Sequence, residues 1–520
     1  MSIYTQTRAR RSLIDTMLFR ALSQASTILG YIVLVRAMRK EDFGIYSLLY
    51  SFIPVVSTVV SLGLEQTLRR YQPEYLRTGN TGAAAWLVRF VASARFGANV
   101  IILGILLLAW NHLAPLFQLT PYRGAFMLFC MLILLHFQLQ IVQMTLAAHM
   151  LHRYSVGAVV TLSVAKLIGY SLLASFDALT LERAILADTA AYAIAFVFVR
   201  SVYLLHSRRN HLDDGGRPPP EDRRRLLRYG LYTNFNDAGT LLLDQKLDNF
   251  FIAAFIDPIS VGIYAFYSRL ADMINNVTPL GLFDNVIQPM FFATRPAEAD
   301  RRIPQYFTLL LNLNFVPYWP VLAFSLVYHA ELVHVIFGGK FVEESWLLPI
   351  MIAVTMINSI ATPVTLVAQY EERPGVVLAS KITAVYNIVA LLVLVPWGGL
   401  YGAALARGSA TLLKNCFIWW HVRHRAVWGN ALSFVLSGTV LWGGVVLLCT
   451  TLKSSLAAPP IVQLALGAAI CAATLLIYLR TPAISRSDRD LLQSLFHGRE
   501  ARLLQWLGLL RPATPGGATL

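Results

Sequence analysis

The sequence predicts an all-α protein that crosses a membrane many times. Of its 520 residues, 56% are apolar and only 14% are charged, and the mean hydropathy is +0.58. A soluble protein carries about 25% charged residues, so this composition excludes an ordinary soluble globular protein. Apolar runs also recur roughly every 30 residues without a long polar stretch between them, which indicates one membrane-embedded unit rather than several soluble domains.

Windows of about twenty apolar residues, each able to cross ~30 Å of hydrocarbon, predict about fourteen transmembrane helices. The predicted spans are 17–38, 43–64, 86–110, 124–148, 155–176, 183–205, 229–255, 259–292, 305–328, 344–370, 376–395, 400–420, 431–451 and 460–480. The residues before the first span are polar and basic and show no cleavage-site pattern. We therefore expect the first span to remain in the protein as an anchor rather than to be removed as a signal peptide.

Basic residues are distributed unequally between the two sides of these spans. Counted on alternate sides, 25 Lys and Arg lie on the side of the N-terminus and six lie on the other. Because basic loops stay in the cytoplasm, both termini are expected to be cytoplasmic. The same rule accounts for the formal net charge of +15, and we expect no nucleic-acid partner.

One stretch, 207–225, is rich in Gly, Pro and charged residues and cannot continue a helix, so it is predicted to be a cytoplasmic linker. The sequences on its two sides resemble each other. DFGIYSLLYSF, which begins at Asp42, parallels SVGIYAFYSRL, which begins at Ser260, and TLAAHMLHRYSVG from Thr145 parallels TLVAQYEERPGVV from Thr365. The displacements, 218 and 220 residues, are nearly equal, which predicts a duplicated six-helix unit of the kind found in transporters.

The repeat predicts how the chain is organised. Six spans, an even number, precede the linker, so the two halves would have the same orientation and be related by a pseudo-two-fold axis along the membrane normal. The predicted parts are an N-terminal lobe (1–206), the linker (207–225), a C-terminal lobe (226–425), two additional helices (426–480) and an amphipathic tail (481–520). The tail is expected to lie on the cytoplasmic surface of the membrane.

Three stretches carry a family resemblance. They are RKEDFGIYSLLYSFIPVVSTVVSLGLEQTLRRYQPEYL (39–76), LDNFFIAAFIDPISVGIYAFYSRLAD (247–272), and FGGKFVEESWLLPIMIAVTMINSIATPVTLVAQYEERPG (337–375), which is followed by LVPWGGLYGAALA (394–406). In this order they resemble the polysaccharide-transport branch of the multidrug/oligosaccharidyl-lipid/polysaccharide exporters, the Wzx-type lipid-linked oligosaccharide flippases.

The resemblance implies a two-lobed helical transporter with a central cavity and without enzymatic activity. It implies that the protein moves an undecaprenyl-diphosphate-linked glycan from the inner to the outer leaflet of the bacterial cytoplasmic membrane. The pathway stays open between O-antigen, capsule and exopolysaccharide. The expected partners are this lipid-linked substrate and membrane lipid, with a polysaccharide polymerase as a candidate protein partner, and we expect a monomer.

Acidic residues gather in the predicted span 229–255. Asp237, Asp244 and Asp248 would lie within about 20° of one line along a helix. An ionised group inside the bilayer costs several kcal/mol, so these carboxylates should face water or a partner. Two interpretations stay open: a site for a coupling ion, H⁺ or Na⁺, or an interhelical salt-bridge network. The resemblance favours Asp248 as part of such an ion site, and Asn387, in the predicted span 376–395, is a weaker candidate to supply a neutral oxygen.

A set of cations is the candidate site for the substrate diphosphate, because guanidinium groups bind phosphate oxygens two at a time. Arg95 and Arg269 lie far enough inside their predicted spans to face a cavity. Lys166 is comparably deep, whereas Arg20 is close enough to the cytoplasmic boundary to reach headgroups. For Arg269 the alternative is a pair with Asp272 on its own helix.

Other functions are less consistent with the sequence. No GxxxxGK[ST] motif is present, and the four cysteines, Cys130, Cys416, Cys449 and Cys471, have the spacing of neither a metal site nor a disulfide framework. We therefore expect no ATP-driven pump, no bound metal and no cofactor other than a coupling ion. A drug or cation antiporter of the same superfamily stays an alternative. A polytopic polymerase or glycosyltransferase is the alternative from another class, although the predicted outer loops are short.

Overall fold

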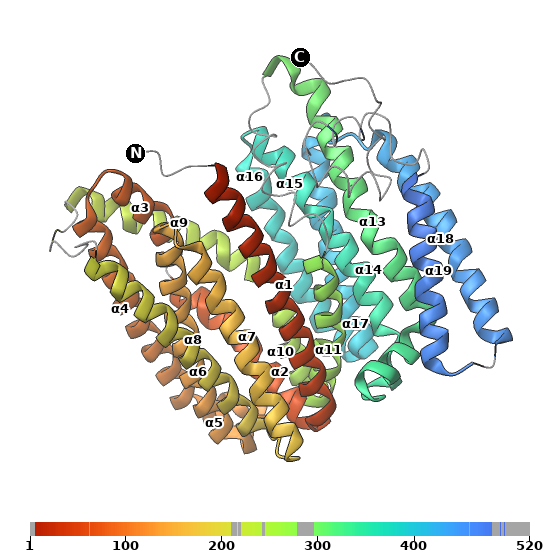
Figure 1. Ribbon diagram of the computed structural model, residues 1–520, viewed down its shortest axis with the longest axis horizontal. Coiled ribbons are helices and arrows are strands. Elements are labelled where there is room, and N and C mark those ends of the chain that lie inside the picture. Colours follow the sequence, from red (N-terminus) through yellow and green to blue (C-terminus); the bar gives the residue numbers. More distant parts are fainter. Residues whose placement is uncertain are drawn as a thin grey trace. The chain divides into compact units, whose positions relative to one another are not determined.

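The computed structural model describes residues 6–61, 63–209, 216, 220–241, 245–277, 296–456, 458–480, 489 and 493. Throughout this part of the chain the secondary structure is helical, without β-strands, which confirms the predicted fold class (Figure 1). Ten of the described helices are long and apolar enough to cross a membrane. They are Lys40–Ser61, Thr81–Leu108, Thr120–Ala148, His152–Ser175, Leu181–Arg208, Glu298–Phe337, Leu347–Tyr370, Pro374–Val422, Ala431–Ser455 and Pro460–Arg480. The protein is a multi-pass membrane protein.

The predicted number of fourteen spans is not confirmed. The predicted spans 376–395 and 400–420 fall within one candidate, Pro374–Val422. The predicted span 17–38 lies in α1 (Gln6–Ala37), which is not among the ten and in which Arg20, Arg36 and several Ser, Thr and Gln residues interrupt the apolar sequence. Parts of the predicted spans 229–255 and 259–292 lie outside the described residues, at 242–244 and 278–292.

By its internal contacts the chain divides into two compact units, 1–265 and 266–520. The first unit contains α1, α2 (Lys40–Ser61), α3 (Leu64–Arg77), α4 (Thr81–Leu108), α5 (Trp110–Leu116), a 3-10 turn at Thr120–Tyr122, α6 (Arg123–Ala148), α7 (His152–Ser175), α8 (Leu181–Arg209), α9 (Pro220–Leu241), α10 (Gln245–Phe255) and the start of α11 (Pro258–Val277). α1 lies along α7, and α8 packs on both α6 and α7 (Figure 1). α2 contacts α4, α6, α8, α9 and α10. The predicted division into lobes at the linker stays a prediction.

The contact between α2 and α11 depends on two glycines. A Cβ atom on Gly44 would lie 2.0 Å from the carbonyl oxygen of Pro258, and one on Gly262 would lie 3.0 Å from the Cα atom of Gly44. Real Cβ atoms do not approach other heavy atoms within 3.0 Å, so alanine does not fit at Gly44. Both glycines belong to the Gly-Ile-Tyr strings of the predicted repeat. In the folded unit these two copies of the motif therefore pack on each other.

α3 is a short amphipathic helix that packs on α9. The ring of Tyr71 meets that of Tyr229 edge to face, with centroids 5.5 Å apart, and Tyr75 donates a hydrogen bond to Asp222 at 3.4 Å. Burial and the nearby Asp222 carboxylate raise the pKa of Tyr75 to about 12, so this phenol stays protonated as a donor at neutral pH. α3 begins after Gly63, whose φ of 69° lies in the left-handed region that glycine adopts without strain.

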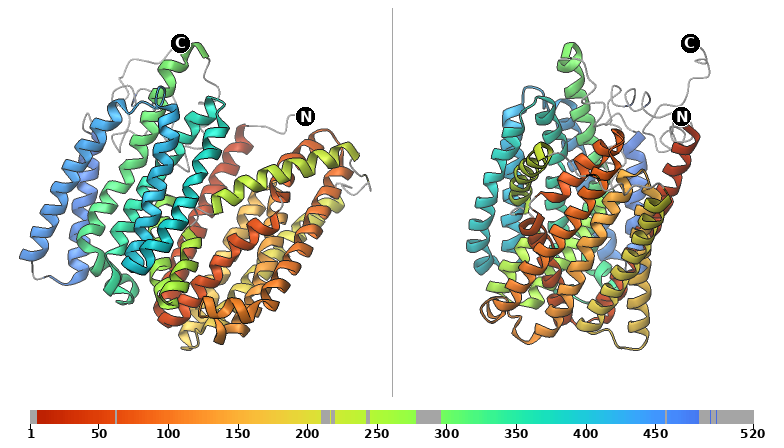
Figure 2. Two further views of the ribbon diagram at one scale, coloured as in Figure 1. Left: turned by 180° about the vertical axis from the view of Figure 1, so that it is seen from behind. Right: turned by 90° about the vertical axis from the view of Figure 1, so that its left-hand side faces the viewer.

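The second unit contains the end of α11, α13 (Pro296–Phe337), a 3-10 turn at Val342–Glu344, α14 (Leu347–Ser359), α15 (Ala361–Tyr370), α16 (Pro374–Ala379), a 3-10 turn at Ser380–Ile382, α17 (Thr383–Val422), α18 (Gly429–Ser455) and α19 (Pro460–Arg480). α18 and α19 lie side by side against α13 (Figure 2). Trp442, Cys449 and Cys471 are buried against Tyr328 in this contact. These two cysteines are therefore packing residues.

α17 is a helical hairpin rather than one long helix. Gly399 has a φ of 56° and a ψ of −134°, which interrupts the helix. Tyr386 donates a hydrogen bond to Ser409 at 3.1 Å, although 23 residues separate them. A continuous helix of that length would extend about 35 Å, so the two arms must run back along each other. They correspond to the separate predicted spans 376–395 and 400–420.

Candidate functional site

Among the residues of the first unit whose burial is described, Arg95 is the most deeply buried cation. It follows Leu87 and Val91 on the buried face of α4, at helical spacing, and its exposed fraction is 0%. Its Nη2 atom lies 2.9 Å from Oε1 of Glu65, on α3, and donates a hydrogen bond to Oγ of Ser57, on α2, at 3.0 Å. Three helices therefore hold this guanidinium in place.

The guanidinium of Arg95 has donors that no described residue accepts. Neither its Nε nor its Nη1 atom has a hydrogen-bond partner among the described residues. One turn farther along α4, Asn99 is also 0% exposed, and both polar atoms of its side chain are unpartnered in the same part of the chain. Leaving a buried polar group unsatisfied costs about 1–3 kcal/mol, and more for a charged group. These N–H groups are suited to phosphate oxygens or sugar hydroxyls.

An apolar cavity lies on the same face of α4. Its volume is about 220 Å³, and α3, α4 and α9 line it with Leu64, Val91 and Leu226 among other residues. Val91 is one turn before Arg95 on α4. Leu64 directly precedes Glu65, the ion-pair partner of Arg95. Apolar space and a fixed positive charge therefore lie within about one helical turn of each other along these helices.

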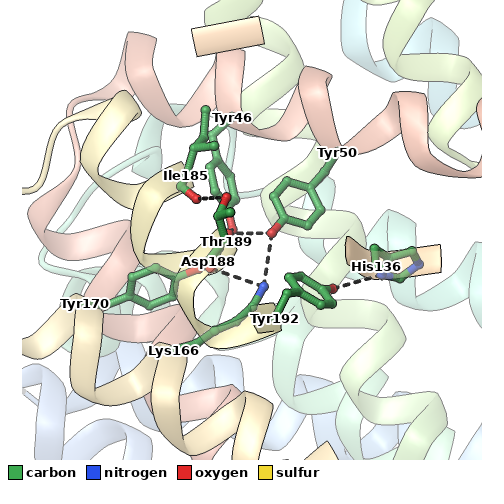
Figure 3. Close-up of polar contacts among 9 residues, drawn as sticks. All are labelled: Tyr46, Tyr50, His136, Lys166, Tyr170, Ile185, Asp188, Thr189 and Tyr192. Carbon is green, nitrogen blue, oxygen red and sulfur yellow. Dashed lines mark hydrogen bonds and ion pairs between the residues drawn. The ribbon is translucent and has the colours of Figure 1, made fainter. Parts of the chain in front are cut away.

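Lys166, on α7, belongs to a second buried cluster that converges on Asp188 of α8 (Figure 3). Its Nζ atom lies 3.1 Å from Oδ1 of Asp188 and donates a hydrogen bond to the hydroxyl of Tyr50 at 3.0 Å. The hydroxyls of Tyr46 and Tyr50, both on α2, donate to Oδ2 of Asp188 at 2.8 and 2.5 Å. Tyr170 donates to Oδ1. Asp188 is fully buried, at 0% exposure.

Sequence reasoning named Lys166 but missed Asp188 and its tyrosines. The signal that pointed to them is modest, because Asp188 is a single acidic residue in the predicted span 183–205 and Tyr46 is the tyrosine of the first Gly-Ile-Tyr string. The second string gives a parallel. Its tyrosine, Tyr264, donates to Oδ2 of the buried Asp248 at 2.8 Å. In both copies of the motif the tyrosine therefore bonds to a buried aspartate.

Asp248 lies on α10, where the neighbouring Asn249 donates to Oγ of Ser51 on α2 at 2.8 Å. Of the other two predicted acidic residues, Asp237 lies in α9 and Asp244 lies outside the described residues. The alignment of the three carboxylates along one helix face stays a prediction, as does their role with a coupling ion.

The remaining candidates are placed differently. Arg20 is exposed on α1, and Arg269 is exposed on the part of α11 that belongs to the second unit. Asn387, in α17 of the second unit, is 2% exposed, and its Oδ1 atom accepts no hydrogen bond within the described ranges. In the first unit, α2 is the common element, because Tyr46, Tyr50, Ser51 and Ser57 contact the Asp188, Asn249 and Arg95 groups.

Comparisons with solved structures identify the fold. The lipid II flippase MurJ in an inward closed conformation matches with a TM-score of 0.65 and 13% identity over 92% of this chain and 100% of that one. An inward-facing multidrug resistance MATE family transporter of the MOP superfamily matches with a TM-score of 0.57 and 12% identity over 79% of this chain and 98% of that one. At these identities the matches show a shared transporter fold.

Comparisons of sequence identify the family. No match is found among curated proteins. The family model described as "Polysaccharide biosynthesis protein" matches residues 11–294, more than half of the chain, including two of the three stretches that carry the predicted resemblance. The chain therefore belongs to the polysaccharide biosynthesis protein family, and its fold is that of the MurJ and MATE transporters.

Proposed function

We propose that the protein is a flippase that moves an undecaprenyl-diphosphate-linked oligosaccharide from the inner to the outer leaflet of the bacterial cytoplasmic membrane. The observation that carries the proposal is Arg95, a fully buried guanidinium with two N–H-bearing nitrogens that find no acceptor among the described residues, in a membrane-spanning member of this family. A diphosphate would supply acceptor oxygens for the Nε and Nη1 donors, which neither Glu65 nor Ser57 contacts. Arg20, Lys166 and Arg269 are proposed to hold the diphosphate at other points of its path.

The chemistry of a lipid-linked glycan divides the work between the bilayer and the protein. The isoprenoid tail stays in the hydrocarbon, while the diphosphate and sugars pass through the protein by alternating access. A headgroup with a charge of about −2 gains about 4.6 kcal/mol per 100 mV when it leaves a cell that is negative inside. Entry of H⁺ or Na⁺ at Asp248, with Asp237 and Asp244 as further ligands, would add to this driving force, and Asn387 is proposed as a further cation-coupling residue. We propose that both termini are cytoplasmic and that the protein acts as a monomer beside a polysaccharide polymerase.

The proposal is tested by complementation of a bacterial strain that lacks its own polysaccharide flippase. Expression of this chain is expected to restore surface polysaccharide, measured by immunoblotting of cell-surface glycan. An inert membrane protein of similar length serves as the control. Normal membrane abundance without surface glycan, in strains that supply each of the three classes of pathway, would contradict the proposal.

A drug or cation antiporter is the second candidate. The buried carboxylates Asp188 and Asp248 favour it, because an organic cation binds to acidic groups. The two candidates predict opposite results in one strain background that lacks both a flippase and drug exporters. Resistance to cationic drugs without restored glycan would favour the antiporter, whereas restored glycan without resistance favours the flippase.

A further inference from the structure

We propose that Asp188 is a proton-binding site and that its protonation releases Lys166 to bind an anionic group. The identity of that anion, the diphosphate of a lipid-linked glycan, rests on the proposed function, whereas the proton site does not. The reaction is a simple proton transfer. One proton adds to a carboxylate oxygen of Asp188, the ammonium of Lys166 keeps its own protons, and the ion pair between the two side chains is lost without the breaking of any covalent bond in either of them.

The geometry shows a carboxylate that is fully occupied on both oxygens. Oδ2 accepts from Tyr46 and Tyr50, and Oδ1 accepts from Tyr170 and faces the ammonium of Lys166 at 3.1 Å. Tyr46 and Tyr170 are also 3.0 Å apart, oxygen to oxygen. These donors come from α2 and α7, while Asp188 is on α8. The cluster therefore joins three helices at one buried point.

Charge balance makes protonation of Asp188 and binding of an anion to Lys166 interdependent. The ion pair is neutral as a whole, but either charge alone in the interior costs several kcal/mol. Protonation of Asp188 therefore requires that Lys166 finds an anion or solvent, and an anion that binds Lys166 favours protonation of Asp188. Because linkage is reciprocal, proton and anion each strengthen the binding of the other.

Two features separate this cluster from a purely structural ion pair. The first is the chemistry of the donors, since a tyrosine hydroxyl both donates and accepts. A protonated Asp188 can donate its new O–H to one of the hydroxyls that now donate to it, so the network stays satisfied in both states. The second is exposure. The Lys166 side chain is 19% exposed, whereas that of Asp188 is 0% exposed. The lysine is therefore the partner that can contact solvent or a ligand.

The described side chains around the pair include, besides Tyr46, Tyr50 and Tyr170, the aromatic Tyr192 and the titratable His136. The ring of Tyr192, on α8, lies 4.8 Å from the Lys166 ammonium, centroid to nitrogen. The hydroxyl of Tyr192 bonds with Nδ1 of His136, on α6, at 3.1 Å. On the side of α1, Gly30 lies against Tyr170. The charge that compensates Asp188 in this geometry is thus that of Lys166.

The test is infrared difference spectroscopy of the full-length protein, reconstituted in vesicles and cycled between acidic and alkaline pH. A buried carboxylic acid gives a carbonyl stretching band that is separate from the bands of its ionised form. We expect such a band at acidic pH in the wild type, its loss in the isosteric variant Asp188→Asn, and its retention in Asp177→Asn, which removes an exposed carboxyl. An unchanged band in Asp188→Asn, or no such band in the wild type, would overturn the proton site.

A second variant guards against misfolding of Asp188→Asn. Lys166→Met keeps the carboxyl but removes its cation, so the acid band is expected to persist at neutral pH, where a lone buried carboxylate takes up a proton. Absence of the band in that variant at neutral and acidic pH would also overturn the site.

The link to an anion is tested separately by proton uptake in weak buffer. Addition of undecaprenyl diphosphate is expected to make the wild type take up about one proton per bound molecule, and to have no such effect on Asp188→Asn or Lys166→Met. Binding of undecaprenyl diphosphate without uptake in the wild type would overturn the release of Lys166, even where the infrared band confirms the proton site and complementation confirms the flippase.

Discussion

Replacement of Gly44 by alanine is expected to remove most folded protein from the membrane. The new Cβ atom would lie 2.0 Å from the carbonyl oxygen of Pro258, which is main chain and cannot rotate away. The helices α2 and α11 must therefore separate, and overpacking of this kind costs about 1–3 kcal/mol or more. α2 also positions Tyr46, Ser51 and Ser57, which contact Asp188, Asn249 and Arg95. Displacement of α2 would therefore disrupt all three of these contacts. Fluorescence-detected size exclusion and the thermal unfolding midpoint measure the effect.

Gly97 supplies a matched control on another membrane-spanning helix. A Cβ atom there meets no heavy atom within 4 Å. Alanine in a helix interior is favoured over glycine by up to about 1 kcal/mol, so Gly97→Ala should leave the midpoint unchanged or raise it. Gly44→Ala with the abundance and midpoint of the wild type would show that α2 and α11 do not pack as described.

Loss of the Arg95 charge is expected to abolish glycan export, and a double variant separates this effect from loss of stability. Arg95→Met alone leaves Glu65 with an uncompensated charge in a side chain that is only 15% exposed, so abundance should fall as well. Glu65→Gln restores charge balance in the double variant. We therefore expect Arg95→Met/Glu65→Gln to reach near-normal abundance but to export at least about 100-fold less glycan, as loss of about 3 kcal/mol of anion binding implies.

Glu65→Gln alone is the control for this pair. It keeps the guanidinium and is expected to retain export, because the substrate meets Arg95 and not Glu65 in our proposal. Surface glycan at the level of the wild type in the double variant, normalised to membrane abundance, would show that Arg95 is a structural residue and would remove it from the substrate path.

The helices of this protein could be predicted from the sequence because membrane spans need only length and apolarity. The two arms of α17 were separable because Pro396, Gly398 and Gly399 break the apolar run, and Gly399 is indeed the point of interruption. The repeated Gly-Ile-Tyr strings predicted a duplication, but not that Gly44 and Gly262 pack on each other, since contact between helices depends on tertiary structure. The total of fourteen spans was harder to predict because α1 is only marginally apolar.

For the candidate site, the depth of a charged residue within its membrane span could be predicted from the sequence, whereas its ion-pair partner could not. Arg95 lies well inside its span, which indicated a buried guanidinium, but its partner Glu65 lies on the separate short helix α3, which follows the left-handed Gly63. The carboxylate that faces Lys166 is 22 residues away, on the next helix, so helix periodicity gave no sign of it. Arg269, by contrast, is exposed, because position within a span does not determine which face a side chain occupies.

The central claim is that this chain carries a lipid-linked anionic glycan across a bilayer, and a leaflet-accessibility assay tests it most directly. Purified protein is reconstituted in vesicles that hold an undecaprenyl-diphosphate-linked oligosaccharide in both leaflets, and an impermeant glycan-oxidising reagent is added outside. The account predicts that the accessible fraction rises from about half to nearly all with the wild type, and stays near half with Arg95→Met/Glu65→Gln. An accessible fraction that stays near half with folded wild-type protein, with and without an imposed membrane potential or ion gradient, would contradict the account.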